Sequence, residues 1–354
     1  MKGIILHGGS GTRLRPLTYS GPKQLIPIAN KPVSQYVLED IISCGVAEVA
    51  IVLGGTFSEL VREFYGDGSR FGVKITYVQQ DRPRGIAHAI GLCEDFVGED
   101  DFVVYLGDNM LQGGIVSQAK KFHESKFDAM VLLKEVDEPS RFGVAQFDSG
   151  GRLVKLVEKP KEAPSRYAVV GVYFLRPSFF KSIGSLKPSW RGELEVTDAI
   201  QCVIDKGMKV GHSIVDGWWF DTGKKDDILY VNALVLDEKA KAEIKGEVAN
   251  SKIEGRVQVA QGAKINNSTI RGPATIAEDC LVENSTIGPH TSIGKSAIVK
   301  DSYVEYCILM ERSEIEGVTR LEESLVGKQA KITEGKKSMG MLKVHLGDFS
   351  EIIL

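Results

Sequence analysis

Residues 2–16, "KGIILHGGSGTRLRP", join a short apolar run to a turn rich in glycine and arginine. The run is long enough for one β-strand, and the turn leaves the backbone bare at Gly8, Gly9 and Gly11. Backbone N–H groups in such a turn can converge on an anion without obstruction by side chains. Arg13 adds a permanent charge whose forked donors suit phosphate oxygens. The stretch therefore predicts a phosphate-binding turn directly after a strand.

Two familiar phosphate-binding motifs do not fit this turn. A P-loop needs GxxxxGK[ST], and no Lys-Ser or Lys-Thr follows Gly8 at that spacing. The dinucleotide fingerprint GxGxxG begins at residues 9–11 but has Leu14 in place of its third glycine. Lys23 follows a short distance on, in a turn that Pro22 constrains, and supplies a second cation. The sequence therefore indicates a phosphate site of another kind.

The composition excludes several classes of protein. The 354 residues predict about two domains, and 43% hydrophobic with 26% charged residues is ordinary for a globular chain. The net charge of -3 gives no basis for a nucleic-acid or acidic-membrane partner. Five dispersed cysteines without a CxxC pair argue against disulfides and zinc and favour a reducing interior. No apolar stretch approaches the roughly 20 residues that span a bilayer. The N-terminus runs straight into a strand, so we expect a cytoplasmic protein.

The first two thirds of the chain alternate short apolar runs with helix-like stretches. The runs rich in Val, Ile and Tyr are the expected strands: 3–6, 48–53, 73–78, 101–107, 129–135 and 167–175. Residues 33–45 carry apolar side chains at helical spacing and stop at Gly45, which is typical of a helix C-cap. The alternation predicts an α/β fold with a mostly parallel sheet flanked by helices.

From about residue 248 the pattern changes to a shorter repeat. Aliphatic residues recur near every sixth position, between small and polar ones: Ile253, Val259, Ile265, Ile270, Ile276, Leu281, Ile287, Ile293, Ile298, Val304, Leu309, Ile315, Leu321 and Val326. This step fits a β-helix, with an aliphatic residue inward from each short strand and Gly or Asn at the corners. At about 18 residues per coil we expect four to five coils. We place the domain boundary after residue 240, with domains 1–240 and 241–354.

Further motifs follow the glycine-rich turn in order. They are "PKQLIPI" (22–28), "LGDN" (106–109), "RFGV" (141–144), "LVEKP" (156–160), "YAVVGVYF" (167–174), "RGELEVTD" (191–198) and "WWFDTG" (218–223). With these motifs the whole chain resembles the sugar-1-phosphate nucleotidylyltransferases, in particular the longer glucose-1-phosphate thymidylyltransferases that end in a left-handed β-helix. The resemblance implies a Rossmann-like mixed sheet in a nucleotidyltransferase domain, 1–240, followed by a left-handed parallel β-helix, 241–354.

The resemblance implies a reaction of dTTP with α-D-glucose 1-phosphate that gives dTDP-glucose and pyrophosphate. Arg13 and Lys23 are expected to neutralise the triphosphate and the attacked α-phosphorus, because two polyanions must meet. The sugar phosphate oxygen attacks directly, so catalysis needs positioning, charge stabilisation and a metal rather than a side-chain nucleophile. By resemblance Asp108 and Asp221 hold Mg²⁺, a hard cation that prefers oxygen ligands. Arg13, Lys23 and Asp108 are therefore the predicted catalytic residues.

The resemblance also assigns the binding residues. Those for the nucleotide are Gly8, Gly9, Gly11, Thr12, Gln80, which would read the base edge, and Gly85, which would contribute its backbone. Those for the sugar phosphate are Gly143, Glu158 and Gly171 on the hydroxyls and Lys159 on the phosphate. Arg191, Glu193 and Asp198 are expected to form the floor of the sugar pocket. Two positions depart from the family pattern: His7 stands where alanine is frequent, and Val170 where threonine is frequent in short members. They leave the nucleotide and sugar preference open.

Three alternatives remain beside this interpretation. UTP could replace dTTP, because Gln80 would read uracil and thymine alike. A non-catalytic sugar-nucleotide-binding regulatory subunit is a second alternative, but such a protein should have lost Arg13, Lys23, Asp108 or Asp221. An added acetyltransferase activity in the β-helix would need a histidine base, for which His290 is the candidate.

For the β-helix we favour a structural or oligomerising role. Tyr303 and Tyr306 could form a subunit contact, so we expect a homo-oligomer, although both rings could equally pack within the coil.

Overall fold

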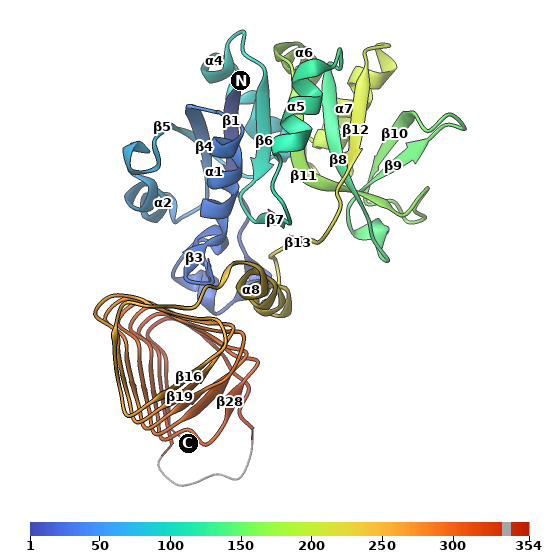
Figure 1. The fold of residues 1–354 in the computed structure, drawn as a ribbon. Coiled ribbons are helices and arrows are strands. Elements are labelled where there is room, and N and C mark those ends of the chain that lie inside the picture. The colour runs from blue at the N-terminus through green and yellow to red at the C-terminus, as the bar shows by residue number, and fades with distance from the viewer. Residues whose placement is uncertain (335–340, 354) are drawn as a thin grey trace. The chain divides into compact units, whose positions relative to one another are not determined.

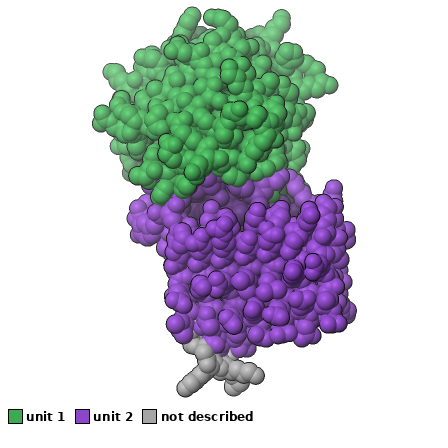
Figure 2. Space-filling model, turned by 90° about the vertical axis from the view of Figure 1, so that its left-hand side faces the viewer, with its two compact units in different colours: residues 1–9, 34–221 green, residues 10–33, 222–354 purple. Residues whose placement is uncertain are grey.

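The computed structural model describes residues 1–334 and 341–353. The chain forms two compact units, coloured in Figure 2. Unit 1 contains residues 1–9 and 34–221, and unit 2 contains residues 10–33 and 222–354. The sequence placed a single boundary after residue 240, whereas the structure groups the segment 10–33 and the residues from 222 onward with the β-helix.

Strand β1 (Lys2–His7), formed by the apolar run before the glycine-rich turn, lies in the parallel part of the unit 1 sheet. It pairs in parallel with β4 (Glu48–Gly54) and with β6 (Phe102–Leu106), and β5 (Lys74–Gln80) continues in parallel beyond β4. Ile4 and Ile5, which point to opposite faces, are both fully buried. A strand covered on both faces explains why these runs are almost entirely apolar.

Beyond β6 the sheet becomes antiparallel. Strand β11 (Tyr167–Leu175) runs antiparallel to β6, β8 (Ala129–Glu135) and β9 (Gly143–Phe147). Strand β10 (Leu153–Glu158) pairs antiparallel with β9, and β12 (Val210–Ile214) pairs parallel with β8. Among the described residues this is a nine-stranded sheet with the main order β10-β9-β11-β6-β1-β4-β5 (Figure 1). The predicted strands and the mixed sheet are confirmed, with a larger antiparallel share than the alternation suggested.

Helices connect and cover these strands (Figure 1). They are α1 (Val33–Ser43), α2 (Ser58–Tyr65), α3 (Ile86–Gly91), α4 (Glu94–Val97), α5 (Val116–Glu124), α6 (Phe180–Ile183) and α7 (Val196–Asp205). Single 3-10 turns are η4 (Ser69–Phe71), η5 (Pro139–Arg141) and η6 (Pro177–Phe179). Gly45 has a left-handed φ of 79° and donates its N–H to the Ile42 carbonyl, which confirms the predicted end of α1. Across the described parts of the chain, every helix is too short or too polar to traverse a bilayer.

Unit 2 contains the predicted left-handed β-helix, whose chain winds through three parallel sheets in turn (Figure 1). The first sheet holds β14 (Glu243–Ile244), β17 (Val257–Val259), β20 (Ala274–Ile276), β23 (Thr291–Ile293), β26 (Ile308–Leu309), β29 (Leu325–Val326) and β31 (His345–Leu346). The second holds β15 (Glu247–Ala249), β18 (Lys264–Asn266), β21 (Leu281–Glu283), β24 (Ile298–Lys300), β27 (Glu314–Glu316), β30 (Lys331–Thr333) and β32 (Glu351–Ile353). The third holds β16 (Lys252–Glu254), β19 (Thr269–Arg271), β22 (Thr286–Ile287), β25 (Tyr303–Glu305) and β28 (Leu321–Glu322).

The β-helix is longer than predicted. Two of its sheets contain seven strands among the described residues, against the expected four to five coils. Coils also form before and after the aliphatic repeat that was used to count them. The predicted interior is confirmed at most positions, but Leu281 and Ile298 are only half-buried, and Val282 and Val299 fill the interior at 0% exposure. Successive residues of a strand point to opposite faces, so a register error of one residue reverses the prediction.

A ladder of serines fixes one corner of the β-helix. Ser251, Ser268 and Ser285 lie 17 residues apart, one coil each, and each hydroxyl accepts the N–H of the residue one coil further on. Each hydroxyl also donates to the carbonyl two residues before it. The preceding residues Asn267 and Asn284 have a left-handed φ, in agreement with the asparagines predicted at the corners. Buried corner N–H groups, which no strand can satisfy, are thus hydrogen-bonded.

Helix α8 (Lys225–Lys239) packs on the β-helix through one buried amide. Asn232 is fully buried, and its Nδ2 donates to the His290 carbonyl at 3.0 Å. Its Oδ1 accepts the Ala29 N–H at 2.8 Å and the Ser292 hydroxyl at 2.7 Å. One side chain therefore joins α8, the segment 10–33 and a coil, which explains why the unit extends beyond the predicted boundary.

We expect Ser285→Ala to lower the free energy of unfolding by about 1–3 kcal/mol, because the buried Ser302 N–H would lose its acceptor. Chemical unfolding of the full chain measures the loss. Ser251→Ala is the matched control, since it lies in the more exposed first coil of the same ladder and should cost less. Equal losses for the two variants would contradict the role given to burial.

Candidate active site

The two predicted metal-binding residues lie at the same end of a small two-stranded sheet. Asp108 follows β6 and immediately precedes β7 (Asn109–Leu111), and Asp221 is the last residue of β13 (Trp219–Asp221). These strands pair antiparallel, with Asp221 directly opposite Asn109. The indole Nε1 of Trp219 donates to Asn109 Oδ1 at 2.8 Å, and Asn109 Nδ2 donates to Asp108 Oδ1 at 3.0 Å. Unit 1 therefore brings the predicted pair together by strand pairing.

This donor set fits a magnesium ion that is shared with a substrate. Carboxylate oxygens are hard ligands, and Mg²⁺ is commonly held by one or two carboxylates together with phosphate oxygens and water. The described residues contain no group of three or more His, Cys, Asp or Glu side chains that could hold a metal. Asp108 and Asp221 could therefore hold Mg²⁺ only where a phosphate supplies further oxygens.

His7, which departs from the family pattern, belongs to the core. Its ring is 3% exposed and contacts Tyr65 edge-on, with ring centroids 5.8 Å apart. Burial lowers the pKa of His7 to about 3, against the opposing effect of the Asp108 carboxylate. The ring is therefore neutral at any working pH, and it packs inside the unit rather than against a ligand.

Gln80, the predicted base reader, closes the end of β5 with 7% of its surface exposed. A Cβ atom added to Gly54 would lie 3.5 Å from Gln80 Oε1 and 3.8 Å from the Gly8 Cα. A Cβ on Gly8 would meet no heavy atom of the described residues within 4 Å, so the space beside it is open. The structure thus brings Gln80 and Gly8 together, as predicted, and adds Gly54.

The loop after Gln80 requires glycine at position 85. Gly85 has a φ of 101°, and a Cβ there would lie 2.4 Å from the Leu194 carbonyl oxygen. The Leu194 N–H bonds to the Arg84 carbonyl, and the Leu194 carbonyl accepts the Ala87 N–H. The backbone around Leu194 therefore holds this loop on both sides of Gly85.

The predicted sugar residues Gly143 and Glu158 lie opposite each other on β9 and β10. A Cβ on Gly143 would lie 2.6 Å from Thr197 Cγ2, and the Thr197 hydroxyl donates to Glu158 Oε2 at 3.2 Å. Burial, and then the nearby Glu195 carboxylate, raise the pKa of Glu158. Glycine leaves Glu158 and Thr197 room to approach, and the buried carboxylate is a strong acceptor for hydroxyl groups.

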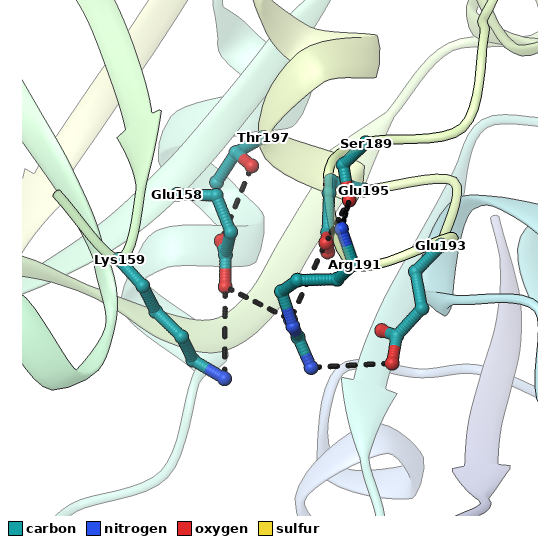
Figure 3. Close-up of polar contacts among 7 residues, drawn as sticks. All are labelled: Glu158, Lys159, Ser189, Arg191, Glu193, Glu195 and Thr197. Carbon is teal, nitrogen blue, oxygen red and sulfur yellow. Dashed lines mark hydrogen bonds and ion pairs between the residues drawn. The ribbon is translucent and has the colours of Figure 1, made fainter.

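Figure 3 shows how cations organise this group of carboxylates. Arg191 Nη1 lies 3.7 Å from Glu158 Oε1 and 3.3 Å from Glu195 Oε1, and its Nη2 lies 3.2 Å from Glu193 Oε1. Lys159, whose φ of 40° is rare for a side-chain-bearing residue, places Nζ 4.0 Å from Glu158 Oε1. The predicted pocket floor of Arg191 and Glu193 thus contacts the predicted sugar residues.

The sequence analysis did not predict that Ser189, Glu195 and Thr197 belong to this cluster. It did predict Asp198 there. Glu195, only 3% exposed, accepts the Ser189 hydroxyl at 2.9 Å, and Thr197 holds Glu158. Glu195 and Thr197 belong to the "RGELEVTD" motif, where their alternation with apolar residues was the available signal. Asp198 was predicted in the floor, but none of the contacts of this cluster involves it, and burial raises its pKa.

Gly171 lets strand β11 pack closely against the β6–β7 turn, which contains Asp108. The register of β11 is irregular between Val169 and Tyr173, and a Cβ on Gly171 would lie 2.6 Å from Leu106 Cδ1 and 3.0 Å from Asn109 Cγ. Only a glycine lets the strand approach the β6–β7 turn this closely. The neighbouring Val170 is fully buried, so it packs in the core.

The predicted cations lie in the segment 10–33 of unit 2. The 3-10 turns η1 (Thr12–Leu14), which contains Arg13, η2 (Leu17–Tyr19) and η3 (Lys23–Leu25) are followed by a hairpin of β2 (Pro27–Ile28) and β3 (Lys31–Pro32). Gly11 has a φ of 60°, and its carbonyl accepts the Thr18 hydroxyl at 2.8 Å. Arg15 stacks on the Tyr19 ring at 4.8 Å, which accounts for it without a ligand. Gly8 and Gly9 belong to unit 1, so the meeting of cations, glycines and carboxylates in one cleft stays a prediction.

The segment 10–33 is held by the β-helix. The Ser20 hydroxyl donates to Asp348 Oδ2 at 2.7 Å, and Asn30 Nδ2 donates to the Ile293 carbonyl at 2.9 Å. A Cβ on Gly347 would lie 3.0 Å from Pro16 Cβ. The position of the arginine- and lysine-bearing turns therefore depends on the last coils as well as on their own backbone.

Comparison with known proteins agrees with this arrangement. Residues 2–238 match the family described as nucleotidyl transferase. The chain belongs to the nucleotidyl transferase family. The match confirms the family-level resemblance that the ordered motifs predict, and it makes the chain an enzyme.

Individual relatives extend over most or all of the chain. It is 43% identical over 354 residues, 99% of each chain, to the glucose-1-phosphate thymidylyltransferase of Streptomyces antibioticus. It is 47% identical over 264 residues, 74% of each chain, to the low-salt glycan biosynthesis nucleotidyltransferase Agl11 of Haloferax volcanii. A similar solved structure is a candidate glucose-1-phosphate thymidylyltransferase from Bacillus anthracis in complex with a sucrose. Its TM-score is 0.62 at 42% identity, over 66% of this chain and 94% of that chain.

We expect Gly171→Ala to lower the free energy of unfolding by about 1–3 kcal/mol, because the added methyl group overlaps Leu106 and Asn109 in this nucleotidyl transferase. Chemical unfolding measures the loss. Gly184→Ala is the control, because its nearest heavy atom would lie at 3.9 Å. A Gly171→Ala protein as stable as the control would show that the turn can move aside.

Proposed function

We propose that this nucleotidyl transferase joins dTTP and α-D-glucose 1-phosphate to form dTDP-glucose and pyrophosphate, with Mg²⁺. The pairing of Asp221 opposite Asn109, beside Asp108, is the observation that carries the proposal. The full-length relative in Streptomyces antibioticus is named for the same reaction.

In this mechanism the sugar phosphate oxygen attacks the α-phosphorus and pyrophosphate leaves. Glu158 and the backbone near Gly143 and Gly171 accept hydroxyl hydrogens of glucose, while Lys159 binds its phosphate. These contacts hold the nucleophile near the α-phosphorus, which supplies much of the rate by positioning. Arg13 and Lys23 stabilise the negative charge of the triphosphate as the bond to pyrophosphate breaks.

Asp108 and Asp221 would hold Mg²⁺ on the phosphate side of the site. The bound ion would neutralise phosphate charge and polarise the phosphoryl oxygens. Trp219 donates a hydrogen bond to Asn109, and Asn109 donates one to Asp108. These two bonds would keep the Asp108 carboxylate oriented toward the metal.

UTP remains the second candidate nucleotide. A glutamine amide pairs with the N3–H and a neighbouring carbonyl of uracil or thymine in the same way, because the bases differ only in a methyl group. Competition between dTTP and UTP at equal concentration distinguishes the two.

The remaining alternatives have less support. All four residues that a non-catalytic regulatory subunit could lose, Arg13, Lys23, Asp108 and Asp221, are present. For acetyl transfer, the His290 ring already contacts the Tyr306 ring, and its Nε2 lies 3.2 Å from the Asp237 carboxylate. A homo-oligomer formed through the β-helix stays a prediction.

Pyrophosphate release by the purified protein tests the proposal directly. We expect release with dTTP, glucose 1-phosphate and Mg²⁺, and none when any one of the three is omitted. Absence of release across all pyrimidine triphosphates and hexose 1-phosphates would reject it.

Asp108→Asn and Asp221→Asn should each lower kcat by about 100-fold or more, because a metal ligand supplies several kcal/mol of charge stabilisation. Thermal unfolding of both variants should match the parent within a few degrees. Asp216→Asn, at an exposed aspartate two residues before Trp218, should leave kcat unchanged. Full activity in either site variant would remove that residue from the metal site.

Lys23→Ala should lower kcat by about 100-fold while KM for dTTP rises by only about three-fold, if its contact strengthens in the transition state. Steady-state kinetics separates the two parameters, with the exposed Lys74→Ala as control. A rise in KM without a fall in kcat would instead make Lys23 a ground-state binding residue.

A further inference from the structure

A histidine to which the sequence analysis gave no role contacts the base-reading glutamine. His88 lies on α3, and its Nδ1 is 2.9 Å from Gln80 Nε2. An amide nitrogen can only donate, so His88 Nδ1 must accept, and the imidazole must be neutral with its proton on Nε2. This hydrogen bond determines which end of the amide faces the helix.

The opposite end of the amide faces the open side of the site. Gln80 Oε1 lies 3.5 Å from the point where a Cβ on Gly54 would stand, and the Gly8 Cα lies 3.8 Å from the same point. A Cβ on Gly8 would meet no heavy atom of the described residues within 4 Å. The amide nitrogen carries two hydrogens, of which His88 uses one. An oxygen acceptor and one N–H donor therefore remain for a ligand.

This pattern distinguishes pyrimidines by the hydrogen at N3. Uracil and thymine present N3–H beside a carbonyl oxygen, which match the acceptor and the donor of the amide. Cytosine presents an unprotonated N3 beside an amino group, which would match only the rotated amide. We infer that His88 is a positioning residue that holds the Gln80 amide in the orientation that selects thymine or uracil over cytosine. The inference rests on the proposed function and deepens its base recognition.

The surroundings keep His88 in the neutral form that this role requires. Burial and the Arg84 guanidinium lower its pKa below the usual 6.5, against the smaller opposing effect of Asp81. Strand β1 and helices α6 and α7 also contact α3. Within residues 1–334 and 341–353, these elements contribute no charged group to the pKa of His88. Protonation would turn Nδ1 into a donor, which would attract Oε1 and favour the rotated amide.

Two substitutions at position 88 test the inference. His88→Gln keeps an acceptor that does not titrate, and His88→Lys offers donors alone. The readout is the ratio of kcat/KM for dTTP to that for dCTP, in pyrophosphate release with glucose 1-phosphate, from pH 5.5 to 8.5. His123→Gln, at an exposed histidine of α5, is the matched control.

We expect the ratio to fall by about ten-fold or more in His88→Lys, and to stay near the parent value in His88→Gln. In the parent the ratio should be constant where the imidazole is neutral and fall only at acid pH, as His88 becomes protonated, whereas in His88→Gln it should not change with pH. A merely structural role would lower both kcat/KM values together and leave the ratio unchanged.

The outcomes separate this inference from the proposed function. An active parent whose ratio is the same in His88→Lys and at every pH overturns the inference and leaves the function intact. A parent that releases no pyrophosphate with any pyrimidine triphosphate overturns both. Should His88→Lys fail to fold, the pH profiles of the parent and His88→Gln still decide the question, because they need no disruptive substitution.

Discussion

The pairing of two very short strands is the constraint on which the candidate site depends. Neither β7 nor β13 belongs to the large sheet, and each has only three residues. Their register is fixed by the buried hydrogen bond from Trp219 to Asn109. A slip by one residue would turn the carboxylate of Asp221 to the other face. The close approach of Gly171 to Asn109 then ties this small sheet to the strand that borders the sugar residues.

The sugar side of the site follows a different physical rule. Three glutamates around Arg191 are at least partly buried, and a buried carboxylate without a cation would be costly. Arg191 contacts Glu158, Glu193 and Glu195, and the Thr197 hydroxyl satisfies the second oxygen of Glu158. Because Arg191 and Thr197 hold the carboxylate from two sides, Glu158 presents an acceptor in a fixed orientation.

Strand ends were predictable from the sequence, and side-chain networks were not. Apolar runs located β1, β4 and β6, and the prediction that Asp108 follows the carboxyl end of such a strand is confirmed, because β6 ends at Leu106. Glu195 was overlooked despite its alternation with apolar residues, because a glutamate next to a helix start is usually exposed. The interior of the β-helix was predicted one residue out of register at Leu281 and Ile298, because the residue that follows each of them is also aliphatic.

Contacts between different elements of the fold were not predicted either, because they depend on how the elements pack. Nothing in the residues around Asn232 indicates that its amide meets Ala29 and His290, and the domain boundary was therefore placed after α8. Likewise His88 and Gln80 are eight residues apart, on a helix and a strand whose relative orientation only the fold determines.

The contacts of Ser20 and Asn30 with the coils have an evolutionary consequence. The segment with the turns that bear Arg13 and Lys23 is hydrogen-bonded to the β-helix. An exchange of the coils would therefore also alter the contacts that position these two predicted catalytic residues. Recombination at the junction between α8 and the coils would then be tolerated only between proteins that share the residues of these contacts.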